Sequence, residues 1–365
     1  MIVKKIHSLE LAKAFFHCLK NPNMIKLLQG ESMSSKSMSS KRLTNIDLLK
    51  IISIFAVIVI HISSFDLYGY NQTNIPQNTF YIYNIFNMIS RFSVPCFIMI
   101  SGMFLLDKDI TIKQIFKKYI LKIFLAYIIF GTIYAIFDFL NYNYNFLTRL
   151  LSGSSHLWYL LMLIGLYLVT PFLREIIKNK KLTQYFILLN FIFTILIPFV
   201  TYFIKIPGFS FGLKHMNINL PLGYTGYYVL GYYLSKHDVN KTVVYCLGII
   251  GLLVNIILFN QIEYSNKLYD IIFLLPTTYF QSILVFLIFK DLKLKKNYFI
   301  EFIASNTLPI YIVHMIILKL LLNINLNLLY NIPFITIPFV SLFVFLISLL
   351  ISIILKSIPL LKRIL

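Results

Sequence analysis

Long apolar runs follow one another along almost the whole chain after its first 40 residues. Each run is close to the roughly 20 residues that an α-helix needs to cross the hydrocarbon core of a bilayer. Proline and glycine inside several runs are compatible with bundled membrane helices, whose neighbours satisfy the freed backbone groups. The sequence therefore predicts an all-α polytopic membrane helix bundle of about ten transmembrane helices, near residues 47–66, 80–106, 119–140, 156–174, 184–204, 219–235, 242–260, 271–290, 304–323 and 333–356.

The composition excludes an ordinary soluble domain. Hydrophobic residues make up 59% of the 365 residues and charged residues only 13%, whereas a soluble domain carries roughly a quarter charged residues. The net charge of +20 is explained by lysines and arginines in cytoplasmic loops, and no compact basic domain is present to hold a nucleic acid. We expect membrane lipids, and no nucleic acid, among the partners.

The distribution of basic residues predicts the orientation. With the N-terminus inside, 18 lysines and arginines fall on the inner side, and only four fall in outer loops. Cytoplasmic loops carry this excess in membrane proteins, so both termini are expected in the cytoplasm. The inner residues lie within 108–122, 174–181, 236–241, 290–296 and 356–363. Residues 1–41 are expected to form a cytoplasmic tail, partly disordered, and residues 42–365 the membrane domain.

Two ionisable residues mark one face of the first predicted span. Lys50 and His61 are the only strongly polar side chains, apart from serines, between Leu48 and Phe65. They are 11 positions apart, about three helical turns, so they share a face about 16 Å apart along the axis. Ionisable groups at membrane depth usually face a polar cavity and mark a functional site. Taken alone, Lys50 is also compatible with a boundary lysine whose ammonium reaches the interface.

Two further ionisable residues are expected in the same layer. Counting about 1.5 Å per residue from the inner boundary places His61 near 20 Å, Arg91 near 24 Å and His314 near 15 Å. A lone membrane histidine can be a satisfied core residue, but an unpaired arginine at this depth costs at least a few kcal/mol. Trp158 and Tyr159 alternatively fit aromatic anchors at the interface. The three cysteines are far apart and show no metal-binding spacing, so no metal is expected.

Four short patterns in chain order carry a family resemblance. In the first pattern a basic residue precedes a histidine by 11 positions, and in the second an arginine is followed by Pro, Phe and Ser-Gly. In the third a Leu-Trp-Tyr is followed by Leu-Tyr and Thr-Pro, and in the fourth a tyrosine precedes a histidine by three positions. With these patterns the region from about residue 42 onward resembles the bacterial integral-membrane acyltransferase type 3 family, with Lys50 where the family usually has arginine. The residues that match are Lys50, His61, Arg91, Pro95, Phe97, Ser101, Gly102, Leu157, Trp158, Tyr159, Leu166, Tyr167, Thr170, Pro171, Tyr311 and His314.

The resemblance implies a function and a set of roles. Members of this family move acetyl or succinyl groups onto extracytoplasmic sugars. This chain is therefore expected to be a multi-pass enzyme of the bacterial cell membrane that transfers a short acyl group, most simply acetyl, from cytoplasmic acyl-CoA to a hydroxyl of an extracytoplasmic or lipid-linked glycan. An extracytoplasmic partner protein is compatible with that reaction. The implied site residues are His61, Arg91 and His314 for catalysis, Lys50 and Arg91 for the donor, and Trp158, Tyr159 and Tyr311 for the substrate.

The residue chemistry fits these roles. Burial favours a neutral imidazole, which can take the proton of a hydroxyl, and an arginine can stabilise an oxyanion or bind phosphate. A transporter or flippase of a lipid-linked sugar stays open as an alternative, with His61 and Arg91 in a gate or proton relay. The chain shows no inverted repeat of broken helices, the usual indication of a transporter. An inactive membrane scaffold would have no need of the buried Arg91 and His61.

Overall fold

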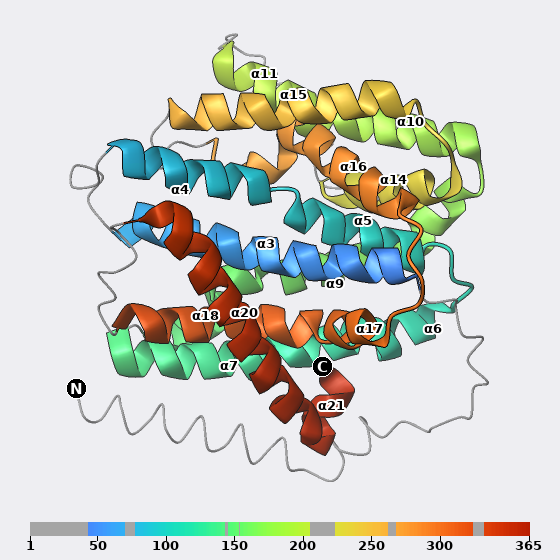
Figure 1. The fold of residues 1–365 in the computed structure, drawn as a ribbon. Coiled ribbons are helices and arrows are strands. Elements are labelled where there is room, and N and C mark those ends of the chain that lie inside the picture. The colour runs from blue at the N-terminus through green and yellow to red at the C-terminus, as the bar shows by residue number, and fades with distance from the viewer. Residues whose placement is uncertain are drawn as a thin grey trace.

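The protein is a helical bundle, as predicted (Figure 1). The computed structural model describes residues 43–69, 77–142, 145–152, 154–204, 223–261, 268–323 and 332–365. These residues form helices joined by turns and short connections, with no strand among them. The tail predicted for residues 1–41 lies outside the described residues.

Most long helices lie roughly along one direction, and α20 crosses them obliquely (Figure 1). In chain order the elements are α3 (Thr44–Gly69), α4 (Gln77–Ser90), α5 (Ser93–Leu105), α6 (Ile112–Ile115), η2 (Phe116–Ile120), α7 (Leu121–Tyr142), α8 (Phe146–Ser152), η3 (Ser155–Leu157), α9 (Trp158–Ile177), α10 (Lys180–Asn190), η4 (Phe191–Leu196), α11 (Ile197–Phe203), α14 (Thr225–Lys236), α15 (Lys241–Asn260), η5 (Ile272–Leu274), α16 (Pro276–Asp291), α17 (Tyr298–Ser305), α18 (Thr307–Asn323), α20 (Pro333–Ser357) and α21 (Pro359–Ile364).

Seven helices in the described part of the chain are long and apolar enough to cross a membrane, or eight if the bent pair α17–α18 counts as one span. The other two predicted spans correspond to α14, with 12 residues, and α16, with 16 residues. At 1.5 Å per residue these helices are about 18 and 24 Å long, short of the roughly 30 Å hydrocarbon core. The multi-pass architecture is confirmed, and the count of ten stays a prediction.

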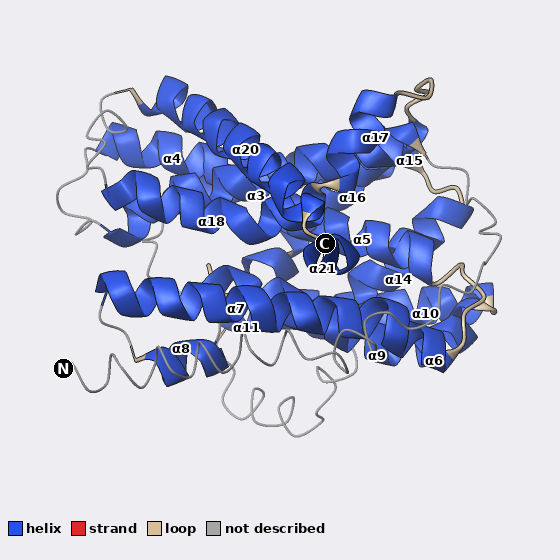
Figure 2. Cartoon of the chain, turned by 90° about the horizontal axis from the view of Figure 1, so that it is seen from below, coloured by secondary structure: helices blue, strands red, loops and turns tan. Residues whose placement is uncertain are grey.

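Helix α3, which carries Lys50 and His61, is central to the bundle. It packs against α4, α5, α16, α17, α18 and α20. Its apolar side chains Ile46, Ile54 and Ile58 are completely buried, whereas Lys50 and His61 are only partly buried. Figure 2 shows α18 between α20 and α7. Helix α3 is thus surrounded by helices from both halves of the chain.

The predicted second span is broken in its middle. Helix α4 ends at Ser90 and α5 begins at Ser93, so Arg91 and Phe92 form a turn. Pro95 contributes to the break, because it has no backbone N–H to donate to the carbonyl of Arg91. The side-chain amide of Gln281 on α16 donates instead to two carbonyls at the end of α4, those of Met88 and Ile89, at 3.0 Å each. A residue from another helix therefore satisfies the break.

The predicted ninth span is also broken. Helices α17 and α18 meet at Asn306 and are bent by 58°. The amide of Asn306 donates to the carbonyl of Phe302 at 2.8 Å, and the ammonium of Lys356 donates to the carbonyl of Ser305 at 2.7 Å. These bonds satisfy carbonyls that the end of α17 leaves exposed. The bend sets the start of α18, the helix that carries Tyr311 and His314.

Helices α5 and α14 cross at glycines. A Cβ atom on Gly102 would lie 1.8 Å from the carbonyl oxygen of Tyr228, and one on Gly231 would lie 2.1 Å from that of Met99. Small residues allow such close approach of membrane helices. Gly102 of α5 and Gly231 of the tyrosine-rich α14 thus have a packing role, because they let the two helices approach closely.

Candidate functional site

His61 and His314 meet in the interior of the bundle. His61 lies on α3 and His314 on α18, and their ring centroids are 5.2 Å apart. His314 is fully buried. Arg91 lies within electrostatic range of His61. The common layer predicted from depth is therefore a physical cluster in three dimensions.

The proton of His314 can be assigned from its neighbour. Its Nδ1 is 2.5 Å from the carbonyl oxygen of Tyr311, one helical turn earlier. A carbonyl only accepts hydrogen bonds, so Nδ1 carries the proton and Nε2 carries the lone pair. That Nε2 is buried and makes no hydrogen bond with any residue that the structure describes. His314 thus directs an acceptor into the cluster.

A third histidine, His156, joins the other two. It lies in the short η3 turn ahead of α9 and is only 2% exposed. Its ring is 5.6 Å from that of His314 and 4.6 Å from that of Tyr134, in edge-to-face geometry. At the start of the span predicted near residues 156–174 a histidine could equally be solvated, but the structure buries His156. Its place two residues before Trp158 of the Leu-Trp-Tyr pattern was the available signal.

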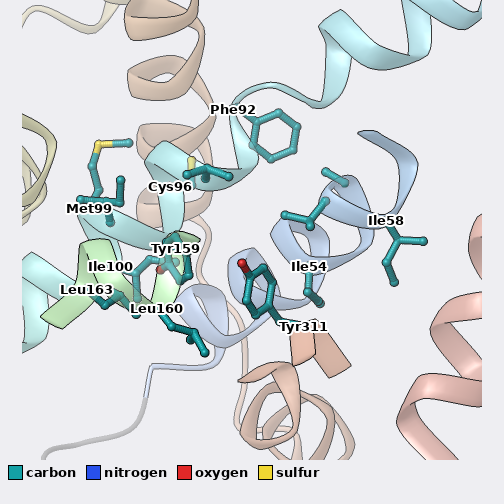
Figure 3. Close-up of a cluster of buried hydrophobic side chains, with 14 of the residues drawn as sticks. Ile54, Ile58, Phe92, Cys96, Met99, Ile100, Tyr159, Leu160, Leu163 and Tyr311 are labelled. Atoms are coloured by element: carbon teal, nitrogen blue, oxygen red, sulfur yellow. The ribbon is translucent and has the colours of Figure 1, made fainter. Parts of the chain in front are cut away.

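Two tyrosines, Tyr159 and Tyr311, lie between this cluster and a cavity; Figure 3 shows both among the buried side chains around them. The rings of Tyr159 and Tyr311 are 5.4 Å apart, and the ring of Tyr311 is 5.8 Å from that of His314. The hydroxyl of Tyr311 donates to the backbone carbonyl of His156. Tyr311 thus packs against the histidines and fixes the η3 turn, while Tyr159 packs against Tyr311 from α9.

A cavity of about 210 Å³ extends from these tyrosines toward Lys50. Lys50 pairs with Asp47 at 2.8 Å, and its ammonium lies 5.2 Å from the ring centre of Phe104. Most of the lining is apolar, which suits a chain-like ligand with few polar groups. The lining residues are Lys50, Val57, Val94, Phe97, Ile100, Ser101, Ile123, Tyr159, Leu163, Tyr167, Thr307, Leu308 and Tyr311.

Arg91 and Trp158 lie on another side of the cluster, joined by Phe273. The guanidinium carbon of Arg91 is 5.3 Å from the ring centre of Phe273, and the rings of Trp158 and Phe273 are 6.3 Å apart. Trp158 is 37% exposed, whereas the adjacent Tyr159 is buried. The two aromatic residues, predicted together, therefore face different parts of the site.

A charge cluster centred on the buried Asp138 lies next to the histidines. Asp138 on α7, 2% exposed, pairs with Lys319 on α18 at 2.5 Å and with Arg149 on α8 at 3.5 Å. The ammonium of Lys319 also lies 5.7 Å from the ring centre of Tyr134, which packs on His156. The sequence reading did not single out Asp138 and Lys319. They tie the helix that carries His314 to the helix that carries Tyr134.

This arrangement suits proton transfer at a buried polar centre. It combines imidazoles, a guanidinium and a largely apolar cavity that approaches them from the side of Lys50. Within the described ranges no group of three or more His, Cys, Asp or Glu side chains is arranged to hold a metal ion. General acid–base and electrostatic stabilisation are the two kinds of catalysis that these side chains can supply.

The comparisons with known proteins agree with this chemistry. A family model described as an acyltransferase domain matches residues 43–356. No curated protein and no solved structure matches the chain. The matched region includes the three histidines, Arg91 and the cavity. Because this match covers far more than half of the chain, the protein belongs to the acyltransferase type 3 family and is a multi-pass membrane acyltransferase.

Proposed function

We propose that the protein is an O-acyltransferase of the bacterial cell membrane. It takes a short acyl group, acetyl in the simplest case, from acyl-CoA on the cytoplasmic side. The acceptor is a hydroxyl of an extracytoplasmic or lipid-linked glycan. The observation that carries the proposal is the cavity that begins at Lys50 and reaches Tyr159 and Tyr311 beside the histidine cluster.

The apolar cavity fits the acyl-pantetheine part of the donor. Lys50 at its far end provides a positive charge for the phosphates of coenzyme A. Asp47 neutralises part of that charge at 2.8 Å, and the ammonium of Lys50 keeps two further donor positions. In this arrangement the thioester reaches Tyr311, and therefore the histidines, from the inner side.

His61 acts as the general base. It takes the proton of the acceptor hydroxyl while the oxygen attacks the thioester carbonyl carbon. The new C–O bond forms, the C–S bond breaks, and the proton passes to the sulfur of coenzyme A, which leaves as the free thiol. His314, whose Nε2 carries a lone pair, orients His61 or the acceptor hydroxyl.

Arg91 and Trp158 serve the other reactants. The positive charge of Arg91, within electrostatic range of His61, stabilises the negative charge that develops on the reacting oxygens or holds a donor phosphate. Trp158, stacked near Phe273 and partly exposed, offers an apolar surface for a sugar ring. Tyr159 and Tyr311 line the path of the acyl group.

Mass spectrometry of cell-surface glycans tests the proposal. Cells that contain the protein should carry glycans heavier by the mass of one acyl ester than those of cells without it, and mild alkali should remove the difference. Cells that produce His61→Ala at the same membrane level are the matched control and should lack the ester. Equal amounts of glycan at the surface with no ester difference would contradict acyl transfer. Loss of the glycan itself would instead favour the flippase.

A further inference from the structure

His156 is a buried side chain whose polar atoms have no adequate partner. Both ring nitrogens are inaccessible, and neither makes a hydrogen bond of good geometry with a described residue. The imidazole lies near the backbone of Ile312, whose carbonyl already accepts from the hydroxyl of Tyr134 at 2.7 Å. Buried polar side chains are nearly always hydrogen-bonded, so such an exception calls for a ligand or a catalytic role.

The surroundings fix the position of His156 but leave its nitrogens available. Its backbone carbonyl is held by the hydroxyl of Tyr311. Its ring packs edge-to-face on the rings of Tyr134 and His314, contacts that hold the plane of the imidazole without engaging its nitrogens. The ring centroid of Tyr311, a residue that lines the cavity, is 5.9 Å away. A group that emerges from the cavity past Tyr311 therefore meets His156.

The charges nearby favour a donor role over a basic one. A histidine that acts as base becomes positive and is usually stabilised by a carboxylate. Asp138, the carboxylate on the neighbouring α7, is already engaged by Lys319 and Arg149. Lys319 itself lies within electrostatic range of His156. A neutral imidazole keeps one N–H, and such an N–H can polarise a carbonyl group.

We propose that His156 is a third catalytic histidine, whose N–H donates to the carbonyl oxygen of the acyl group as that oxygen becomes negative. This inference rests on the acyl transfer proposed above. When the acceptor oxygen bonds to the carbonyl carbon, the π electrons move onto the carbonyl oxygen and His156 holds that charge. The electrons return as the C–S bond breaks, and the proton travels through His61 to the sulfur. His156 itself gains and loses no proton.

Two substitutions separate this role from packing. His156→Phe keeps the planar ring against Tyr134 and His314 but removes both nitrogens, whereas His156→Gln keeps an N–H donor and cannot act as a base. In proteoliposomes supplied with acetyl-CoA and the glycan acceptor, His156→Phe should lower kcat about 10²–10³-fold, the usual loss of one oxyanion donor. His156→Gln should recover at least about tenfold of that loss. Melting temperatures and the KM for acetyl-CoA should stay close to wild type.

Three results would overturn the assignment. One is a His156→Phe protein with the kcat of wild type. Another is a His156→Gln protein no more active than His156→Phe. The third comes from a dithioester of coenzyme A, in which sulfur, a weaker acceptor, replaces the carbonyl oxygen. The wild type should use it about tenfold more slowly than the thioester, and His156→Ala, which has no N–H donor at this position, should discriminate less. Equal discrimination by the two proteins contradicts the contact even if His156→Phe does not fold. A wild type that makes no ester would count against the proposed function itself.

Discussion

Replacing Gln281 by leucine should loosen the break that positions Arg91. The side-chain amide of Gln281 donates to the carbonyls of Met88 and Ile89, and its oxygen lies 3.4 Å from the amide nitrogen of Asn255. Gln281 is 2% exposed, so water cannot easily replace these bonds. Leucine preserves most of the volume and removes all three interactions.

The expected loss of stability depends on which of the groups bonded by Gln281 keep another partner. A buried polar group left without a partner costs about 1–3 kcal/mol. The carbonyl of Met88 keeps a bond from the backbone N–H of Arg91 at 3.3 Å, and Asn255 keeps Thr278 at 3.2 Å. The penalty therefore falls mainly on the carbonyl of Ile89. Because the bond to that carbonyl is only partly buried, we expect the free energy of unfolding to decrease by about 1 kcal/mol, the low end of this range.

The assay uses the single tryptophan of the chain. Trp158 lies 6.3 Å from Phe273, the ring next to Arg91, so its fluorescence reports on the site, while circular dichroism reports on all helices. Both are followed as a denaturing detergent is added to micelles. Ser282→Ala is the matched control: Ser282 is buried one position further along α16, and its hydroxyl donates only to its own helix at Thr278. Its loss should cost under about 0.5 kcal/mol.

Gln281→Leu should also reduce the activity, because the Arg91 turn would shift. A shift of about 1 Å in a positioned charge can cost about 10²-fold in rate, so Gln281→Leu should lower kcat more than KM. If Gln281→Leu matches Ser282→Ala in both stability and kcat, the proposed support of the Arg91 turn is wrong.

Three further changes follow from the structure. Arg91→Ala should abolish transfer and Arg91→Lys should retain little of it, because a lysine lacks the planar two-point contacts of a guanidinium; a fully active Arg91→Ala would contradict the role in charge stabilisation. Asp138→Asn should lower the free energy of unfolding by about 2 kcal/mol, since it leaves the partly buried ammonium of Lys319 beside a neutral group, and the double change Asp138→Leu with Lys319→Met should cost less than the single one. Gly102→Ala should destabilise the α5–α14 crossing by about 1–3 kcal/mol. Gly131→Ala is the control and should not destabilise the protein, because the space around its Cβ position is open. Equal melting temperatures for the two variants would refute the close crossing.

Much of the fold follows from properties that act locally along the chain. Apolar runs of spanning length, together with the rise per residue, place His61, Arg91 and His314 in one layer. The contact between the rings of His61 and His314 agrees with that prediction. Depth alone, however, does not determine which helices are neighbours, so the sequence predicted a shared layer and not a contact.

The broken second span depends on contacts between residues far apart in the chain, which a local sequence pattern does not reveal. Residues 80–106 read as one apolar run, and Pro95 is equally compatible with a kink. The break becomes tolerable because Gln281, 193 positions from Met88, supplies the missing donors. Lys319 and Asp138 are 181 positions apart, and each looks like an isolated charge until the helices pack. His156 stands at the start of a predicted span, where the local sequence fits a solvated residue equally well, whereas the η3 turn and the bond from Tyr311 bring it inside.

Ester formation by purified protein in sealed proteoliposomes tests the central claim most directly. Acyl-labelled coenzyme A is supplied on the inner side and the glycan acceptor on the outer side, and labelled ester and free coenzyme A are measured together. Wild type should produce the two in equal amounts, and His61→Gln, which keeps hydrogen-bonding groups but is no base, should lose about 10²–10⁴-fold in rate while inserting normally. Equal rates for His61→Gln and wild type, or intact glycan crossing the bilayer without ester, would contradict acyl transfer at the histidine cluster.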